Sequence, residues 1–197
     1  MNDNKQFSCS DCKTLSCNQQ GSSLPSGCLG DGVDSAPFLD LYRNGGLVSK
    51  LALAAAEVDT SHTRVQETIA FAHKIGARKI GIAACIGLMN ESKAFAKILD
   101  EHGLDNFCAN CKIGAIDRTE IGVHTKGSLC NPIMQAEILN KQETDLNVII
   151  GLCIGHDALF SMYSNAPVTT LVVKDRVLKN NPVVALHTAV TSSAKPY

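Results

Sequence analysis

The stretch GLCIGHD, residues 151–157, places a thiol, an imidazole and a carboxylate directly after the apolar run LNVII. Such a run is typical of a buried strand, and α/β proteins bind ligands just beyond the carboxyl ends of their strands. His156 could act there as a metal ligand or a proton donor, and Asp157 could orient its ring or only cap the following helix. Lys174, which follows a later strand-like run, could hold an anionic substrate or be a solvated loop charge. These residues are the candidates for catalysis.

Cysteines recur at the ends of the predicted strands. Cys85, Cys111 and Cys153 each stand at or just past such an end. Cys130 precedes Asn-Pro and a helical pattern, so we expect it at the N-cap, where the helix dipole favours a thiolate. We call these four residues the rim cysteines. Together they could hold an iron–sulfur cluster or a metal ion, and a three-cysteine cluster would leave one iron open for substrate. Each alone could equally be a small core residue, and Cys108 is left out of the predicted set.

A second group of thiols lies in the first 30 residues, which contain almost no large apolar side chains. Its members are Cys9, Cys12, Cys17 and Cys28. The spacing C-x2-C-x4-C-x10-C lets a tight turn aim two sulfurs at one ion, and the later pair can complete a tetrahedron. Zinc fits such a site, and so does a four-cysteine iron–sulfur cluster. Because this segment cannot bury a core of its own, we expect bound metal to order it; the alternative is a cysteine-bearing tail.

The remainder of the chain alternates between helical and strand patterns. Strands are predicted at 78–87, 105–111, 146–153 and 169–175. Helices are predicted at 45–59, 61–76, 90–103, 130–142, 156–164 and 181–190. Single helical crossovers between strands indicate parallel βαβ units. We therefore expect an α/β domain at 31–197 after a four-cysteine module at 1–30. Its open parallel sheet would have about four strands in the flavodoxin- or Rossmann-like order 2-1-3-4, with helices on both faces. Cys85 and Cys153 would then be neighbours where the order reverses.

Composition narrows the function classes. Nine cysteines in 197 residues, with no apolar leader at the N-terminus, indicate a cytoplasmic protein with metal or redox chemistry rather than a disulfide framework. The net charge of −1 gives no basic field for nucleic acid, and no run reaches the about 20 apolar residues that span a membrane. Dinucleotide-binding, phosphate-loop and nucleophile-elbow motifs are absent. A small-molecule substrate or an electron-transfer partner fits these features, while the sequence leaves the oligomeric state open.

Several segments carry a resemblance over nearly the whole chain. They are CSDCKTLSC, GIAACIGL, CKIGAID, LCNPIMQAEILN, GLCIGHDALF and APVTTLVVKDRVLKNNPVVAL. With these segments the chain resembles a prokaryotic family of uncharacterised, cysteine-rich proteins that are described as metal-binding and have no known function. The resemblance implies that the rim cysteines, His156 and Asp157 belong to the family pattern and that the N-terminal cysteines are a second element. It implies no reaction.

The leading hypothesis is a cysteine-ligated metal or iron–sulfur protein. The rim cysteines would hold a cluster, most simply 4Fe-4S, and the N-terminal four a zinc ion or a second cluster. The chemistry would be redox or sulfur-handling, as in an iron–sulfur oxidoreductase, desulfurase or lyase, with His156 moving protons; this rests on architectural analogy. Two alternatives stay open. One is a metal or cluster carrier or sensor without turnover, and the other is an enzyme with Cys153 or Cys130 as nucleophile and no metal at the rim.

Overall fold

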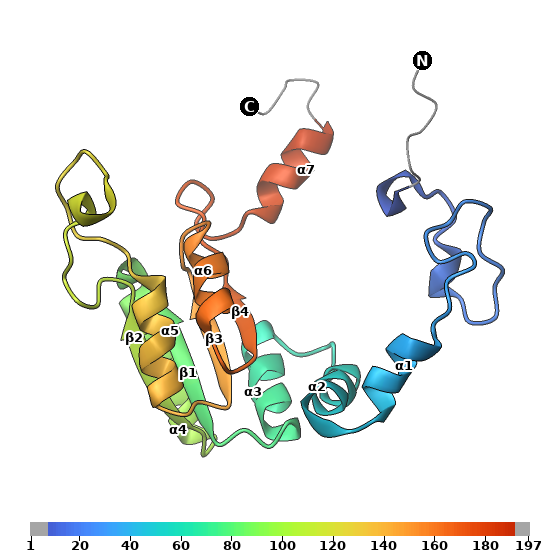
Figure 1. Cartoon of the computed structure of the whole chain (residues 1–197), viewed down its shortest axis with the longest axis horizontal. Helices are drawn as coiled ribbons and strands as arrows, with labels where there is room; N and C mark the ends of the chain where they lie inside the picture. Colours follow the sequence, from blue (N-terminus) through green and yellow to red (C-terminus); the bar gives the residue numbers. More distant parts are fainter. Residues whose placement is uncertain (1–7, 192–197) are drawn as a thin grey trace. The chain divides into compact units, whose positions relative to one another are not determined.

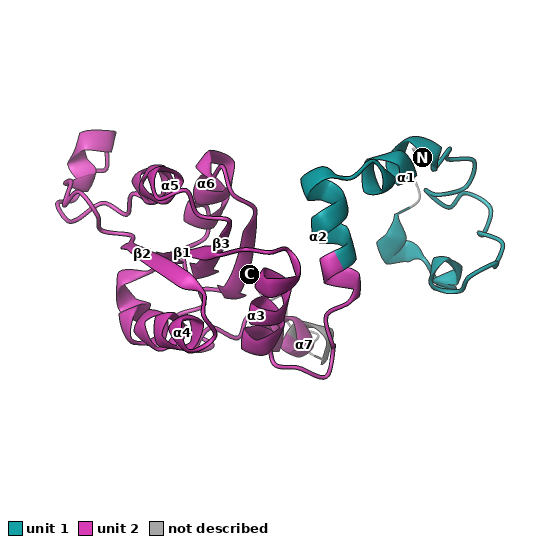
Figure 2. Cartoon of the chain, turned by 90° about the horizontal axis from the view of Figure 1, so that it is seen from below, with its two compact units in different colours: residues 1–53 teal, residues 54–197 magenta. Residues whose placement is uncertain are grey.

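The structure is a computed structural model in which residues 8–191 are described. The chain divides into two compact units, residues 1–53 and 54–197 (Figure 2). The boundary that we expected after residue 30 falls inside the first unit, and residues 1–7 of the expected module lie outside the described part. No helix in the described part is long and apolar enough to cross a membrane.

The first unit consists of short turns followed by helices. Two 3-10 turns occupy Cys9–Asp11 and Ser16–Asn18, and helix α1 spans Ala36–Arg43. Helix α2, Gly46–Ala56, begins in this unit and ends in the second. Helix α2 confirms the Ala- and Leu-rich helix that the sequence predicts, whereas α1 was not expected.

The second unit contains a sheet of four parallel strands in the order β2-β1-β3-β4, as the sequence predicts (Figure 1). The strands are β1 Lys79–Ala84, β2 Asp105–Asn110, β3 Leu146–Ile150 and β4 Val168–Val172. The helices are α3 Arg64–Lys74, α4 Met89–Glu101, α5 Pro132–Lys141, α6 His156–Tyr163 and α7 Val183–Thr191. The strand order makes β1 and β3 the central pair, so their carboxyl ends meet where the order reverses.

Helices cover both faces of this sheet, with α3 and α4 on one side and α5 and α6 on the other (Figure 2). All five residues of β3 are buried, which explains why LNVII is apolar without alternation. The one polar side chain in that run, Asn147, is satisfied because its amide donates to Ser164 and its carbonyl oxygen accepts from Thr144, each at 2.8 Å. The buried core therefore holds the central strands in place, and with them the residues at the strand ends.

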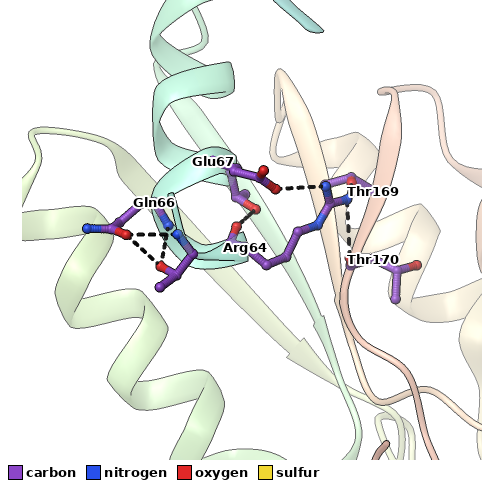
Figure 3. Close-up of polar contacts among 7 residues, drawn as sticks. Arg64, Gln66, Glu67, Thr169 and Thr170 are labelled. Atoms are coloured by element: carbon purple, nitrogen blue, oxygen red, sulfur yellow. Dashed lines mark hydrogen bonds and ion pairs between the residues drawn. The ribbon is translucent and has the colours of Figure 1, made fainter. Parts of the chain in front are cut away.

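Helix α3 is anchored to the edge strand β4 by one side chain (Figure 3). The helix begins with a capping box, in which Thr63 and Gln66 each bond the other's backbone N–H. Arg64, at the first helical position, donates from Nη2 to Thr169 Oγ1 at 2.8 Å and to the carbonyl of Thr170 at 3.5 Å. This guanidinium is the polar link between the first turn of α3 and β4.

Replacing Arg64 with methionine should destabilise the protein by about 1 kcal/mol. The variant loses the hydrogen bond to the Thr169 hydroxyl and the partly exposed ion pair between Arg64 and Glu67. Urea unfolding measures the change. Lys97→Met on α4 is the matched control, because Lys97 is 79% exposed and contacts only Glu101 at 3.7 Å; its cost should stay within about 0.5 kcal/mol. An equal loss of unfolding free energy in the two variants would contradict the anchoring role of Arg64.

Candidate functional site

Backbone hydrogen bonds align the chain segments that carry the rim cysteines. The N–H of Cys111 donates to the last residue of β1 at 2.8 Å, and the N–H of Cys85 donates to the last residue of β3 at 2.9 Å. Asn131 donates its N–H to the carbonyl of Cys111 at 2.8 Å, which places Cys130 beside Cys111. Three cysteines that are far apart in the chain therefore meet at the carboxyl edge of β1 and β2.

Cys111 lies at the centre of this group. Its side chain is buried, and its Sγ accepts a hydrogen bond from the N–H of Ile86 at 3.3 Å. Burial raises the pKa of Cys111 to about 11; the Ile86 N–H opposes that rise, while the neighbouring thiols of Cys130 and Cys85 add to it. The thiols of Cys85 and Cys130 are thus close enough to disfavour negative charge on Cys111, and placing negative charge on all three would require a cation.

The position of Cys130 differs from the expectation. We predicted it at the N-cap of α5, but the cap is Asn131, whose side-chain oxygen accepts the N–H of Met134 at 3.0 Å. Asparagine is the better cap, because a short carbonyl reaches the free N–H groups of the first turn and a thiol accepts them weakly. Cys130 lies one residue earlier, outside the helix and next to Cys111.

Cys153 lies on the same edge, with a different partner. Strand β3 ends at Ile150, so Cys153 is three residues past the strand and not its last residue as predicted. Arg176 donates from Nη2 to Cys153 Sγ at 3.0 Å. This hydrogen bond is the main cause of a raised pKa of Arg176, and the thiols of Cys153, Cys85 and Cys130 contribute through their charge. The guanidinium therefore contacts Cys153 and lies near enough to Cys85 and Cys130 for their charge to affect it.

The loop after β4 is built to hold Arg176 in place. Asp175 accepts the N–H groups of Val177 and Leu178 at 2.9 and 2.7 Å, and Asn180 closes the same turn through the backbone of Asp175. Asp175 is thereby occupied by backbone donors. In the part of the chain that the structure describes, no ion pair joins Arg176 to a carboxylate.

Lys174 and Cys85 both lie close to Gly87. A β-carbon built on Gly87 would stand 3.8 Å from Lys174 Nζ and 3.9 Å from Cys85 Sγ. The stem of Lys174 passes Gly151, at 3.7 Å from the position that a β-carbon would take there. The ammonium and the thiol thus both lie within 4 Å of the position that a side chain of residue 87 would take.

A buried amide supports the rim from below. Gln135 on α5 is fully buried and donates from Nε2 to the carbonyls of Ala84 and Ala109, at 3.2 and 2.7 Å. It therefore ties together the ends of β1 and β2, whose next residues carry Cys85 and Cys111. Within residues 8–191, its Oε1 is buried without a hydrogen-bond partner.

The other candidates take more ordinary positions. Asp157 is the second residue of α6 and accepts the N–H of its neighbour Ala158 at 2.9 Å, while the N-cap of the helix is Gly155, with no side-chain cap. His156 is the first residue of α6 and is half-buried, with its N–H bonded to the carbonyl of Cys153 at 2.9 Å. Cys108 lies within β2, three residues before Cys111, and burial raises its pKa.

The N-terminal cysteines lie in the first unit. Cys9 and Cys17 are exposed, while Cys12 and Cys28 are half-buried. The N–H of Leu15 donates to Cys12 Sγ at 3.4 Å and is the largest cause of a lowered pKa of Cys12. Neither here nor at the rim, as far as the described residues extend, do three His, Cys, Asp or Glu side chains stand close enough to hold one metal ion.

Sequence reasoning did not include Arg176 and Gln135 among the candidate residues. A cation in the loop after a strand is typically a solvated charge, and a glutamine in a helix is typically a surface residue. Both occur in segments that carry the family resemblance, KDRVLKNN and NPIMQAEILN, and this was the signal available for them.

Comparison with known proteins bears on these residues. The model of a family described as "Protein of unknown function (DUF1847)" matches residues 35–171, a range that contains all four rim cysteines and ends before Lys174. A protein of Methanocaldococcus jannaschii, "Uncharacterized protein MJ0455", is similar to this chain, with 47% identity over 148 residues that cover 71% of this chain and 76% of the relative. No solved structure matches the chain.

Proposed function

Since the chain belongs to the DUF1847 family, whose function is unknown, we propose from its own geometry that it is an iron–sulfur protein. Cys85, Cys111 and Cys130 bind a cluster at the carboxyl edge of the sheet, and the protein carries out sulfur-handling or redox chemistry there. The observation that supports the proposal is that backbone hydrogen bonds align the three separate segments carrying Cys85, Cys111 and Cys130 at one edge of the sheet, around buried Cys111.

The donor set favours a cluster over a single zinc ion. Two thiolates on one tetrahedral zinc stand about 3.8 Å apart, given zinc–sulfur bonds of about 2.3 Å. In a cluster each thiolate binds a different iron, so its ligands stand farther apart. Three thiols on separate backbone segments suit the wider spacing, and the N–H of Ile86 that bonds Cys111 Sγ is the kind of donor that tunes cluster thiolates. When bound, the cluster would supply an electron reservoir and an open iron.

Cys153 is assigned a different role from the other three. Its Sγ already accepts a hydrogen bond from Arg176, and a guanidinium competes with a metal for the same lone pair. His156 and Lys174 stay available near the rim for proton transfer and for holding a negatively charged substrate, as proposed from the sequence. The carboxylate of Asp157 already accepts the N–H of Ala158, which leaves it the weakest of the predicted catalytic residues.

The N-terminal cysteines are proposed to bind a zinc ion, or a second cluster, independently of the rim. The support is local: the N–H of Leu15 bonds Cys12 Sγ, the contact that holds a thiolate in a C-x2-C turn ready for metal. A zinc ion would order a segment that lacks a hydrophobic core.

Anaerobic reconstitution with ferrous iron and sulfide tests the rim. The starting protein carries Cys9→Ser and Cys17→Ser, so that the N-terminal thiols contribute no iron. We expect it to bind iron and acid-labile sulfide and to show a broad visible charge-transfer band. Adding Cys111→Ser and Cys130→Ser should reduce iron and sulfide to background, because two of three ligands are gone.

Two further variants test which cysteines are cluster ligands. Cys108→Ser, in the middle of β2, is the matched control and should keep full iron content. Cys153→Ser should also keep it. Unchanged iron in the variant without Cys111 and Cys130 would refute the proposal, and loss of iron in the Cys153 variant would show a four-cysteine site.

A further inference from the structure

We propose that Cys153 accepts a sulfane sulfur from an anionic donor that Arg176 and Lys174 bind, forming a persulfide at the rim. The inference deepens the proposed function, because it rests on Cys153 being the thiol that the cluster leaves free. The donor class is a small anion whose terminal sulfur is bonded to a good anionic leaving group, such as a thiosulfonate or a low-molecular-weight persulfide.

The first support is the contact between thiol and guanidinium. Arg176 Nη2 stands 3.0 Å from Cys153 Sγ, held by the turn that Asp175 closes. A fixed cation beside the sulfur stabilises negative charge on the attacking thiolate and then on the persulfide that replaces it. Cys153 is half-buried, so a small anion can reach it from solvent.

The second support is the position of the Lys174 ammonium near Gly87. Lys174 Nζ and Cys85 Sγ flank Gly87, where a β-carbon would make only ordinary contacts at 3.8 and 3.9 Å. Gly87 lacks the positive φ that would demand glycine there, so backbone strain does not account for the missing side chain. Glycine at this position therefore leaves no side-chain atom of residue 87 against the Lys174 ammonium or the Cys85 thiol.

The third support is the positive charge of Lys174 and Arg176 beside the thiols. Across residues 8–191, neither Lys174 nor Arg176 forms an ion pair with a carboxylate. The carboxylate between them, Asp175, is taken up by the N–H groups of its own turn. Two cations that face thiols and lack acidic partners attract an anion to the thiols.

The reaction balances without an added oxidant or reductant. With thiosulfate, the Cys153 thiolate attacks the outer sulfur, and a bond forms between Sγ and that sulfur. The sulfur–sulfur bond of thiosulfate breaks, and sulfite leaves with the bonding electron pair. The products are a Cys153 persulfide anion and sulfite, and the charges on both sides are equal. The thiol proton of Cys153 passes to solvent before the attack.

The experiment mixes full-length, anaerobically purified protein with thiosulfate, and in a parallel arm with glutathione persulfide. Sulfite release and peptide mass spectrometry report the transfer. Thiosulfate should release one sulfite per chain, and Cys153 should carry one added sulfur in at least one arm. Cys153→Ser should abolish both signals. Arg176→Gln should slow the transfer at least about tenfold, with partial recovery in Arg176→Lys.

Gly87→Ala is the sharpest variant, because it should fold normally and still slow the transfer, since its methyl group would stand against the Lys174 ammonium and hinder an anion there. Lys97→Gln and Cys108→Ser are controls that should react like the unchanged protein. The proposal is overturned if neither donor modifies Cys153, or if Gly87→Ala and Arg176→Gln both react at the unchanged rate.

Iron content, measured on the same samples, separates the two proposals. Sulfur transfer that survives in the variant lacking Cys111 and Cys130 supports this inference whether or not the rim binds iron. Normal iron content with no modification of Cys153 overturns this inference and leaves the cluster proposal standing.

Discussion

Replacing Gly151 with alanine should destabilise the protein by about 3 kcal/mol or more, through two additive causes. Gly151 has φ +66°, a left-handed conformation that disfavours side chains, and its new β-carbon would stand 2.1 Å from Leu88 Cδ1. Leu88 is buried, so it cannot move away freely. Chemical denaturation measures the loss in the free energy of unfolding. Thiol alkylation of the folded variant shows whether the rim cysteines become more accessible.

Gly155→Ala is the matched control for this prediction. Gly155 lies four residues later in the same connection, has φ +80°, and has nothing within 4 Å of its β-carbon position. Alanine there meets the backbone penalty alone, about 1 kcal/mol. The difference between the two variants therefore isolates the collision with Leu88, and equal losses would contradict it.

Replacing Gln135 with glutamate should have the other large effect. Its Nε2 donates to two carbonyl oxygens, and a carboxylate in the same place would turn both contacts repulsive in a fully buried position. We expect a loss of about 3 kcal/mol or more at pH 7. A protonated carboxyl can still donate one hydrogen bond, so the loss should be smaller in acid.

The pH dependence of Gln135→Glu has a definite sign. Burial raises the pKa of the new carboxyl in the folded state above its unfolded value of about 4.3. The folded state then holds more protons, so the stability of the variant relative to the parent is highest below about pH 4 and falls as pH rises. Gln135→Met is the control, because it removes the same donors without adding charge. Urea unfolding at a series of pH values should show a slope for glutamate and none for methionine; parallel behaviour would contradict the prediction.

The strand order was predictable because it follows from local signals and one general rule. Short apolar runs separated by single helical crossovers give parallel neighbours, and the order 2-1-3-4 is confirmed. The strand ends were less predictable. The pattern extended the third strand to Cys153, whereas it stops at Ile150, since the left-handed Gly151 turns the chain out of the sheet. Helix α1 was missed because its exposed apolar residues, including Phe38 at 57%, show no buried stripe.

For the candidate site, residue type and strand position put Cys85 and Cys111 in the predicted set, and an expected helix start added Cys130. These signals could not separate Cys153 from the other three. That separation depends on Arg176, which lies 23 residues later and reaches Cys153 only through a folded turn. The binding of metal by either group of cysteines stays a proposal that the experiments above address.

The connection between sheet order and thiol position has a consequence for biosynthesis. Cys85, Cys111 and Cys130 precede β3 in the chain, yet β1 acquires its second neighbour only when β3 is synthesised and inserted beside it. Parallel pairing of distant strands forms slowly. For an interval during synthesis, the three thiols of each nascent chain have therefore left the ribosome before the sheet is complete. During that interval, oxidants and unspecific metal ions compete for these thiols. Assembly conditions, rather than the finished fold, should set how much protein acquires the correct occupant.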